Sequence, residues 1–467
     1  MLLERIYTPG LAQVAYLVAD EAAGVAAVID PRRDVEVYLD WAVAHGVRIA
    51  AILETHVHAD FVSGACELAA ATDAPIYASR LGEQEYPTAL LDDGDEIAVG
   101  SLWLRALATP GHTPEHLAFL LINPASGPDP VALFSGDALF VGEVGRPDLL
   151  GAEQTETLVR QLYRTVQRLK ELDDAVVVYP GHTAGSSCGK KIGDAPSTTI
   201  GQERIGNYAF HAHAEEEFVR QVLAGMPVPP TYYPVLKRVN KVGPPLLSEL
   251  PPGAPLSAGA VRGAMTSGAL VIDARSSAAF GAGHIPGARF AGLGPDFATW
   301  MGWLAPYDRD LILVLDMDDG FAEARTELRR IGLDRVAGYL VGGMAAWNGD
   351  RAVLPQLTAK ELAARWGDGA EGITVLDVRS DDEWRRGHVP GAVHRFAGEI
   401  ARGASLPVAR EVPVAVICGS GYRSNVAASL LEAQGYTKLL NVAGGMDAWE
   451  TAGLPEERGD HAGKYGA

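Results

Sequence analysis

The chain has few cysteines, only Cys66, Cys188 and Cys418 among 467 residues. So few thiols exclude a disulfide framework and fit a reducing, cytoplasmic location, where a cysteine can work as a thiolate. No apolar run approaches the roughly 20 residues that a membrane span needs. The first ten residues also lack the apolar core of a secretory signal. We therefore expect a cytoplasmic protein with no membrane partner.

Basic residues are the second shortage. The 39 lysines and arginines are outnumbered by 59 aspartates and glutamates, so the formal net charge is −20 at pH 7. A charge of this sign repels the phosphates of nucleic acids and of anionic membrane surfaces. We therefore expect no nucleic acid as a partner.

The length is sufficient for about three domains of roughly 150 residues each. The apolar residues at 25–30 predict a strand, and the stretches 35–44 and 153–170 predict helices, so we expect an α/β protein throughout. Nine prolines fall between Pro227 and Pro255. This composition predicts a semi-rigid linker over residues 226–255.

The most informative motif follows the apolar segment 49–53, which predicts a strand. The motif places His56, His58 and Asp60 within five positions. Histidines at this spacing can also lie on one face of a strand without any metal. Taken alone, the motif leaves a structural role and a metal site equally open.

Three later segments repeat the arrangement of an apolar strand, a glycine and a potential ligand. They present His112, Asp137 and His182, each beside a glycine that lets the backbone turn sharply. The order and the residues of all four motifs resemble the metallo-β-lactamase fold superfamily over residues 1–225. The resemblance implies an αββα sandwich with a metal groove at one edge.

Phe61 departs from the superfamily pattern, because dinuclear zinc hydrolases such as glyoxalase II have a metal-binding histidine there. The sequence most resembles the persulfide dioxygenases, a branch with one metal. The resemblance implies that His56, His112 and Asp137 hold this metal. Two histidines with one carboxylate suit Fe(II) and leave positions open for dioxygen and substrate. We expect one Fe(II) per chain, with zinc as the alternative.

The other polar residues of these motifs are His58, Asp60 and His182. In a one-metal site we expect them to orient the ligands or to hydrogen-bond substrate, with loop stabilisation as the alternative. Arg146 and Lys190 lie near the motifs in sequence. Each could bind the carboxylates of glutathione or coenzyme A, or face solvent.

The two cysteines of this half have different expected roles. Cys66 is expected to be an ordinary buried residue. Cys188 follows His182 by six residues in a loop rich in glycine and serine. It could approach the metal groove or pack within the loop.

Residues 414–424 indicate a different chemistry, because an apolar strand is followed by Cys418, a glycine-rich turn and Arg423. Backbone N–H groups of such a turn and of the next helix favour a thiolate and bound anions. Arg423 offers a planar cation for an oxyanion such as sulfite or thiosulfate. A buried structural cysteine is the alternative. The loop residues expected to contact substrate are Gly419, Ser420, Gly421, Tyr422 and Ser424.

The surrounding motifs resemble a rhodanese domain over residues 355–460. They are DVR at 377–379, HVPGA at 388–392 and GGMDAW at 444–449. Four residues separate Cys418 from Arg423, as in sulfurtransferases, whereas related phosphatases have five. The resemblance implies that Cys418 takes a sulfane sulfur and carries it as a persulfide.

Similar motifs occur earlier in the chain and predict another rhodanese module, over residues 256–352. They stand at 273–275, 284–288 and 342–347. Aligning the two GGM motifs without gaps puts Asp316 opposite Cys418 and Phe321 opposite Arg423. This copy is therefore expected to be inactive, as a structural spacer or a docking surface. A changed catalytic function built on its aspartates 316, 318 and 319 is the alternative.

Both resemblances concern sulfur. A persulfide dioxygenase fused to tandem rhodanese modules would oxidise a thiol persulfide, such as glutathione persulfide, to sulfite. Its Cys418 would give or use thiosulfate in sulfide detoxification. A zinc thioester hydrolase of the glyoxalase II type with a sulfurtransferase domain is the alternative. A sulfur sensor without turnover at the metal is a third option, and a homo-oligomer stays open.

Overall fold

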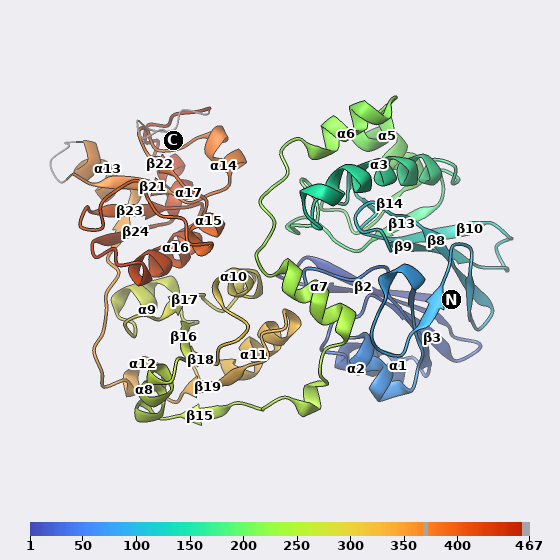
Figure 1. The fold of residues 1–467 in the computed structure, drawn as a ribbon, viewed down its shortest axis with the longest axis horizontal. Coiled ribbons are helices and arrows are strands. Elements are labelled where there is room, and N and C mark those ends of the chain that lie inside the picture. Colours follow the sequence, from blue (N-terminus) through green and yellow to red (C-terminus); the bar gives the residue numbers. More distant parts are fainter. Residues whose placement is uncertain (368–371, 460–467) are drawn as a thin grey trace. The chain divides into compact units, whose positions relative to one another are not determined.

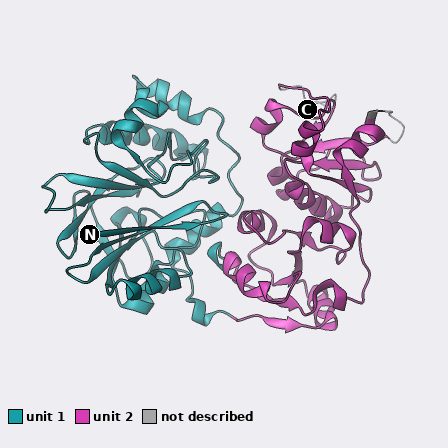
Figure 2. Cartoon of the chain, turned by 180° about the vertical axis from the view of Figure 1, so that it is seen from behind, with its two compact units in different colours: residues 1–250, 329–332 teal, residues 251–328, 333–467 magenta. Residues whose placement is uncertain are grey.

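The computed structural model describes residues 1–367 and 372–459 and divides into two compact units (Figure 1). Figure 2 shows unit 1, residues 1–250 with 329–332, and unit 2, which contains the rest of the chain. The expected domain end at residue 460 lies outside the described residues. Within the described ranges, no helix has the length and apolar character of a membrane span.

Unit 1 contains two six-stranded sheets. The first has the order β1 (Leu2–Thr8), β2 (Gln13–Asp20), β3 (Val25–Ile29), β4 (Arg48–Leu53), β5 (Ile76–Ser79), β6 (Ala89–Leu91). The second has the order β14 (Thr198–Thr199), β13 (Val177–Pro180), β10 (Pro130–Gly136), β9 (Leu117–Ile122), β8 (Leu102–Ala108), β7 (Glu96–Val99). A separate pair is formed by β11 (Leu139–Phe140) and β12 (Glu143–Val144).

The two sheets form a sandwich, because their facing sides share one apolar core that includes Val18, Leu53 and Phe119. The first sheet is covered on its outer face by α1 (Glu36–Ala44) and α2 (Ala65–Thr72). The second is covered by α3 (Ala152–Leu169) and α6 (Glu215–Leu223). Figure 1 shows these two helix layers on opposite sides of the sheets. The expected αββα sandwich is confirmed.

The sequence pattern of α3 explains how it covers the sheet. Its buried apolar side chains, Leu158, Leu162 and Leu169 among them, recur at helical spacing, so one stripe faces the core while charged residues face solvent. The shorter helical elements of the unit are α4 (Ile200–Gly206), α5 (Tyr208–His211), η1 (Arg80–Gly82) and η2 (Leu247–Glu249).

Residues 226–250 differ from the linker that the prolines predict. They belong to unit 1 and contain α7 (Tyr233–Val242). Pro234 is compatible with this helix because it stands in the first turn, where its missing N–H costs nothing. Leu236 and Asn240 are buried against the unit. The proline-rich composition hid this helix.

Unit 2 contains two five-stranded sheets in which all pairings between strands are parallel. The first has the order β15 (Ala254–Leu256), β19 (Val336–Leu340), β18 (Leu311–Val314), β16 (Leu270–Asp273), β17 (Arg289–Phe290). The second has the order β20 (Gln356–Thr358), β24 (Leu439–Ala443), β23 (Val414–Ile417), β21 (Thr374–Asp377), β22 (Val393–His394). Two parallel-sheet modules were expected and are confirmed.

Helices flank both sheets of unit 2. The first module has α8 (Ala258–Thr266), α9 (Ser277–Ala282), α10 (Phe297–Leu304), α11 (Gly320–Arg330) and α12 (Gly343–Ala346). The second has α13 (Ala359–Gly367), α14 (Asp381–Arg386), α15 (Ala397–Ala401), α16 (Tyr422–Ala433) and α17 (Gly445–Thr451). Each module has an apolar core of its own.

Candidate metal centre and sulfur-transfer loop

Four strands of unit 1 bring the motif residues together. Each motif residue follows the end of one of these strands. His56, His58 and Asp60 follow β4, His112 follows β8, Asp137 follows β10, and His182 follows β13. The strands β8, β10 and β13 point the same way, since β9 is antiparallel to both of its neighbours and β10 is parallel to β13. Their carboxyl ends therefore meet at one edge.

His56, His112 and Asp137 each offer one ligand atom, and these atoms lie within 4.8 Å of one another. All three side chains are buried. His112 Nε2 lies 3.4 Å from Asp137 Oδ2. His56 Nε2 and Asp137 Oδ2 have no hydrogen-bond partner among the described residues. Buried polar atoms are normally paired, so this cluster fits a metal ion.

Hydrogen bonds fix which nitrogen of each histidine is available. His112 Nδ1 lies 2.9 Å from the Arg146 carbonyl oxygen, which can only accept, so Nε2 keeps its lone pair. His56 Nδ1 lies 2.9 Å from the Thr55 hydroxyl, which donates to Asp30. Burial lowers the pKa of both histidines below 6.5. Both are therefore neutral, as metal ligands must be.

His182 lies between two carboxylates. Its Nδ1 donates to Asp137 Oδ1 at 2.8 Å and its Nε2 donates to Asp60 Oδ2 at 2.7 Å. Burial disfavours a charge here, but the two carboxylates raise the pKa of His182 well above 6.5. His182 therefore links the two carboxylates and orients Asp137.

His58 also faces carboxylates. Its Nε2 lies 3.2 Å from Asp30 Oδ1 and 3.5 Å from Glu54 Oε2. Burial opposes the charged form, but these carboxylates raise the pKa of His58 to about 9. The buried ring of Phe61 packs on His58, with centroids 4.4 Å apart. His58 thus holds the motif loop, together with Asp30.

His116 and Asp30 contribute to the centre without having been singled out from the sequence. His116 Nε2 accepts the backbone N–H of Asp137 at 2.9 Å, and its ring stacks on His56. Burial lowers the pKa of His116 to about 3, which keeps it a neutral acceptor. Asp30 accepts the backbone N–H of Thr55 at 2.7 Å. The sequence offered one signal for each residue. Asp30 directly follows the strand at 25–29, and His116 stands four residues after His112.

Helix α7 lies on the same loops. Asn240 Nδ2 donates to the carbonyl oxygens of His58 and Phe61 at 2.9 and 2.7 Å. One turn earlier stands Lys237, whose pKa is lowered by burial and whose charge contributes to the lowered pKa of His56. A lysine near the metal centre could not be recognised while this stretch was assigned to a linker.

Cys188 lies at the metal centre. Cys188, Asp60 and His182 form a further group whose ligand atoms lie within 4.8 Å of one another. Burial raises the pKa of the thiol well above its usual value, and Tyr233 Oη lies 4.0 Å from Sγ. Of the two placements that the sequence left open, approach to the groove is the one observed.

Arg146 and Lys190 differ from the expected carboxylate-binding residues. The buried guanidinium of Arg146 donates to both oxygens of Asp148 and to the Pro227 carbonyl. Lys190 Nζ donates to the carbonyl oxygen of Gln221 at 2.7 Å. Both cations are used to hold loops and helix ends, so neither presents a free charge to a substrate.

Glycines beside the ligands leave room for Asp137. A Cβ at Gly145 would overlap the Asp137 carbonyl oxygen, and one at Gly181 would come within 2.8 Å of Asp137 Oδ1. The glycine before His182 was expected to allow a turn. The structure shows a second role for Gly181, because the absence of a side chain leaves room for the Asp137 carboxylate.

The candidate sulfur-transfer loop, residues 418–423, follows β23. Cys418 is buried, its Sγ accepts the backbone N–H of Gly421 at 3.1 Å, and the Ser424 hydroxyl lies 3.4 Å away. The helix α16 begins at Tyr422, slightly before the expected start near Ser424. Gly445, at φ +53°, approaches so closely that a Cβ would overlap the Cys418 carbonyl oxygen.

Arg423 forms a two-pronged ion pair with Glu383, at 2.7 and 2.6 Å. Burial raises the pKa of Glu383, but the hydrogen bonds from Arg423 outweigh it and lower that pKa to about 2. The pair fixes the guanidinium beside the loop, since a Cβ at Gly419 would come within 3.0 Å of its Nη2. Glu383 was missed in the sequence. In the structure it also forms the capping box of α14 with Ser380.

Strand pairing in the cysteine-less module shows that the gapless alignment of the two modules is wrong at this loop. Asp273 pairs with Val314 as Asp377 pairs with Ile417, so the next residue, Leu315, is the counterpart of Cys418. Asp316 is therefore one position too late. The loop before α11 is one residue longer than the loop before α16, which a gapless alignment cannot detect. The copy still has no nucleophile.

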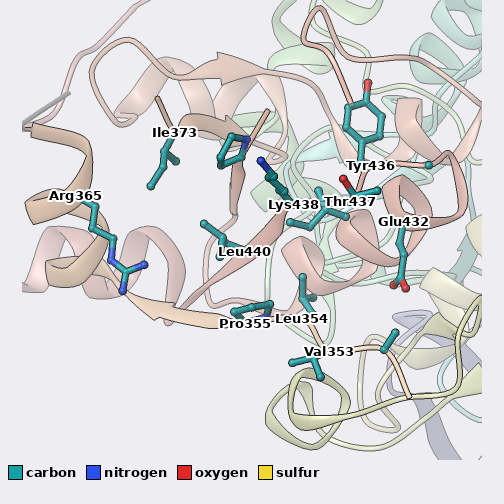
Figure 3. Close-up of a pocket in the computed structure, with 14 residues that line it drawn as sticks. Val353, Leu354, Pro355, Arg365, Ile373, Glu432, Tyr436, Thr437, Lys438 and Leu440 are labelled. Carbon is teal, nitrogen blue, oxygen red and sulfur yellow. The ribbon is translucent and has the colours of Figure 1, made fainter. Parts of the chain in front are cut away.

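A pocket of about 620 Å³ lies in the module that carries Cys418, away from that residue. Its lining residues Ile373, Pro413 and Lys438 come immediately before β21, β23 and β24, so it adjoins the amino ends of the strands. Figure 3 shows Arg365 and Leu440 among the other side chains around it. Because Cys418 follows the carboxyl end of β23, this pocket is separate from the sulfur-transfer loop.

Comparisons with known proteins agree with this architecture. The metallo-beta-lactamase superfamily profile matches residues 8–182, and the rhodanese-like domain profile matches residues 257–350 and 358–452. A probable metallo-hydrolase of Burkholderia pseudomallei is 29% identical over 49% of this chain and 89% of its own length. A hydroxyacylglutathione hydrolase of Gloeobacter violaceus is 35% identical over 36% of this chain, which spans 62% of that protein.

The match to one solved structure covers more of this chain. The crystal structure of a metallo-beta-lactamase from Staphylococcus aureus is 35% identical, with a TM-score of 0.67, and the match covers 72% of this chain and 98% of that one. The protein belongs to the metallo-beta-lactamase superfamily and carries two rhodanese-like domains after its metal-binding fold.

Proposed function

We propose that this chain oxidises a low-molecular-weight thiol persulfide, such as glutathione persulfide, to sulfite with one Fe(II), and that Cys418 couples this oxidation to sulfur transfer. The observation that carries the proposal is Phe61, whose buried ring packs on His58 with centroids 4.4 Å apart. A phenyl ring cannot bind a metal, whereas a dinuclear hydrolase would need a ligand at this position. This arrangement supports a single metal.

His56, His112 and Asp137 would hold the iron, because two neutral imidazoles and a carboxylate suit Fe(II). When bound, the iron supplies the redox chemistry by which dioxygen oxidises the terminal sulfur of the persulfide. The chain's own contribution is orientation. His182 holds the Asp137 carboxylate, and His116 holds its backbone N–H. Burial opposes ionisation of Asp137, yet the neighbouring histidines keep its pKa below the usual range.

Lys237 gives the centre a positive charge in a strongly acidic protein. Glutathione persulfide carries carboxylates, and a net charge of −20 would otherwise repel it. Arg146 and Lys190 are engaged elsewhere. In this proposal Lys237 therefore attracts the anionic part of the substrate.

Cys418 performs the sulfur transfer. Its thiolate attacks the outer sulfur of a persulfide, the S–S bond breaks, and the carrier leaves as a thiolate that takes up a proton. Sulfite then attacks the outer sulfur of the Cys418 persulfide, which releases thiosulfate and restores the Cys418 thiolate. The Gly421 N–H stabilises negative charge on Sγ. Run in reverse, the same residues use thiosulfate.

Oxygen consumption tests the proposal. Protein loaded anaerobically with Fe(II) is given glutathione persulfide, beside a zinc-loaded sample, and total metal per chain is measured on both. We expect one metal per chain and oxygen uptake only with iron. No uptake with iron would sink the proposal.

A hydroxyacylglutathione hydrolase function is the second candidate. It is favoured by the similarity to the Gloeobacter violaceus enzyme and by the group Asp60, His182 and Cys188, which could bind a second metal. In that case the zinc-loaded chain would hold two metals and hydrolyse S-lactoylglutathione. The same two samples distinguish the candidates.

A further inference from the structure

The catalytic loop of the active rhodanese module has an anchor outside that module. Tyr422 is the first residue of α16 and lies between Gly421 and Arg423 of the loop that carries Cys418. Before it, Gly421 donates its N–H to Cys418 Sγ at 3.1 Å. After it, Arg423 pairs with Glu383. A displacement of Tyr422 would therefore move both groups.

The side chain of Tyr422 reaches the cysteine-less module within unit 2. Its hydroxyl donates to the Gly292 carbonyl oxygen at 2.9 Å, and its ring meets Phe290 edge-on, with centroids 5.4 Å apart. Gly292 fits closely, since a Cβ there would come within 3.0 Å of the Arg275 carbonyl oxygen and 3.4 Å of the Tyr422 ring.

Further contacts continue this docking along α16. Ser429 Oγ accepts the backbone N–H of Phe290 at 3.1 Å, and His284 Nε2 lies 3.0 Å from Glu432 Oε2. Residues 422, 429 and 432 are seven and three positions apart, so they lie on one face of the helix. The cysteine-less module thus contacts the helix that begins at the catalytic loop.

Tyr422 also borders a cavity of about 420 Å³ that contains the loop residues Asp316 and Asp319 of the cysteine-less module. Phe290 and Gly292, which the Tyr422 side chain contacts, line the same cavity. Burial raises the pKa of the Tyr422 phenol above its usual value, so the hydroxyl stays a donor at neutral pH.

We propose that the cysteine-less module acts as a positioning element for sulfur transfer, holding the catalytic loop of the other module through the Tyr422 hydroxyl and the Phe290 ring. This inference rests on the proposed role of Cys418. It gives the copy without a nucleophile a function in catalysis that does not need a ligand of its own. Tyr422 is a positioning residue, because it acts through Gly421 and Arg423.

The test is Tyr422→Phe, which removes one oxygen atom and keeps the ring. We expect kcat/KM for sulfur transfer from thiosulfate to cyanide to fall about fivefold to tenfold, as for the loss of one neutral hydrogen bond. We also expect slower alkylation of Cys418 by iodoacetamide, measured on the Cys418 peptide by mass spectrometry. Phe290→Leu, in the other module, should slow both reactions without changing oxygen uptake at the metal centre.

Tyr436→Phe is the matched control. Tyr436 is buried in the active module, and its hydroxyl accepts the backbone N–H of Leu406 at 3.2 Å, away from the catalytic loop. This variant should lose stability without slowing the alkylation of Cys418. Equal alkylation rates in wild type and Tyr422→Phe would overturn the inference. A wild type whose Cys418 reacts with neither thiosulfate nor iodoacetamide would overturn the proposed sulfur transfer instead.

Discussion

The two rhodanese-like modules share a framework and differ in the loop that the framework carries. In each, a buried arginine donates to the aspartate two residues before it, with Arg275 bonded to Asp273 and Arg379 to Asp377. In each, the same guanidinium also reaches a glycine carbonyl eight residues later. These bonds tie a strand end to the following helix. They are structural, because the inactive copy keeps them.

The two loops differ in the groups proposed to react and in their length. Leu315 stands in place of Cys418, and Phe321, the second residue of its helix, stands in place of Arg423. Counting from the aspartates of the shared ion pairs, Ala279 corresponds to Glu383, so the carboxylate that holds the arginine is missing as well. Nucleophile, cation and counter-ion are therefore absent together from a module whose framework is intact, so the fold does not need them.

Replacing the nucleophile should give the largest effect. Cys418→Ser is expected to lower sulfur transfer at least about a thousandfold, since the thiolate is the attacking group. Oxygen uptake should survive, with sulfite replacing thiosulfate among the products. Leu315→Cys, made in the Cys418→Ser background, is the control. Sulfur transfer by that double variant would show that the loop around Leu315 is competent after all.

The shared ion pairs should respond alike in the two modules. Asp377→Asn and Asp273→Asn each leave a buried guanidinium without its counter-charge, which costs about 3–5 kcal/mol. Hydrogen exchange measured module by module should show the loss in the altered module. A much smaller loss in the cysteine-less copy would mean that its framework is not maintained in the same way.

The Glu383–Arg423 pair should give the active module a pH dependence that the other lacks. The folded-state pKa of Glu383, about 2, lies below its usual 4.5. The stabilisation is therefore complete above pH 4.5 and is lost as the pH falls toward 2, by on the order of 1–2 kcal/mol after solvent screening. Unfolding of the active module followed from pH 6 to pH 3 measures it. Glu383→Gln should remove this dependence, and an unchanged profile in that variant would contradict the assignment.

Much of the fold could be predicted from local pattern. The strand expected at 25–30 is β3, and the helix expected at 153–170 is α3, because strong periodicity survives in any context. The linker prediction failed where composition and pattern conflict, since Pro234 occupies a helix turn that tolerates it. The one-residue difference in loop length near Asp316 could not be predicted either, because only the strand pairing shows that Leu315 corresponds to Cys418.

The candidate site divides in the same way. The motifs identified the cluster His56, His112 and Asp137, since each ligand ends a strand and the strands meet at one edge. Partners from distant segments, such as Lys237 of α7 and Glu383 of α14, carry no motif that links them to the site. Only the three-dimensional packing brings them there.

The central claim is that the metal centre and Cys418 are separate catalysts in one chain. The most direct test is oxygen uptake by Fe(II)-loaded His112→Ala with glutathione persulfide, with sulfur transfer measured on the same sample and His211→Ala, an exposed histidine of the same unit, as the control. The account predicts loss of oxygen uptake with sulfur transfer retained. Oxygen uptake at the wild-type rate in His112→Ala would contradict it.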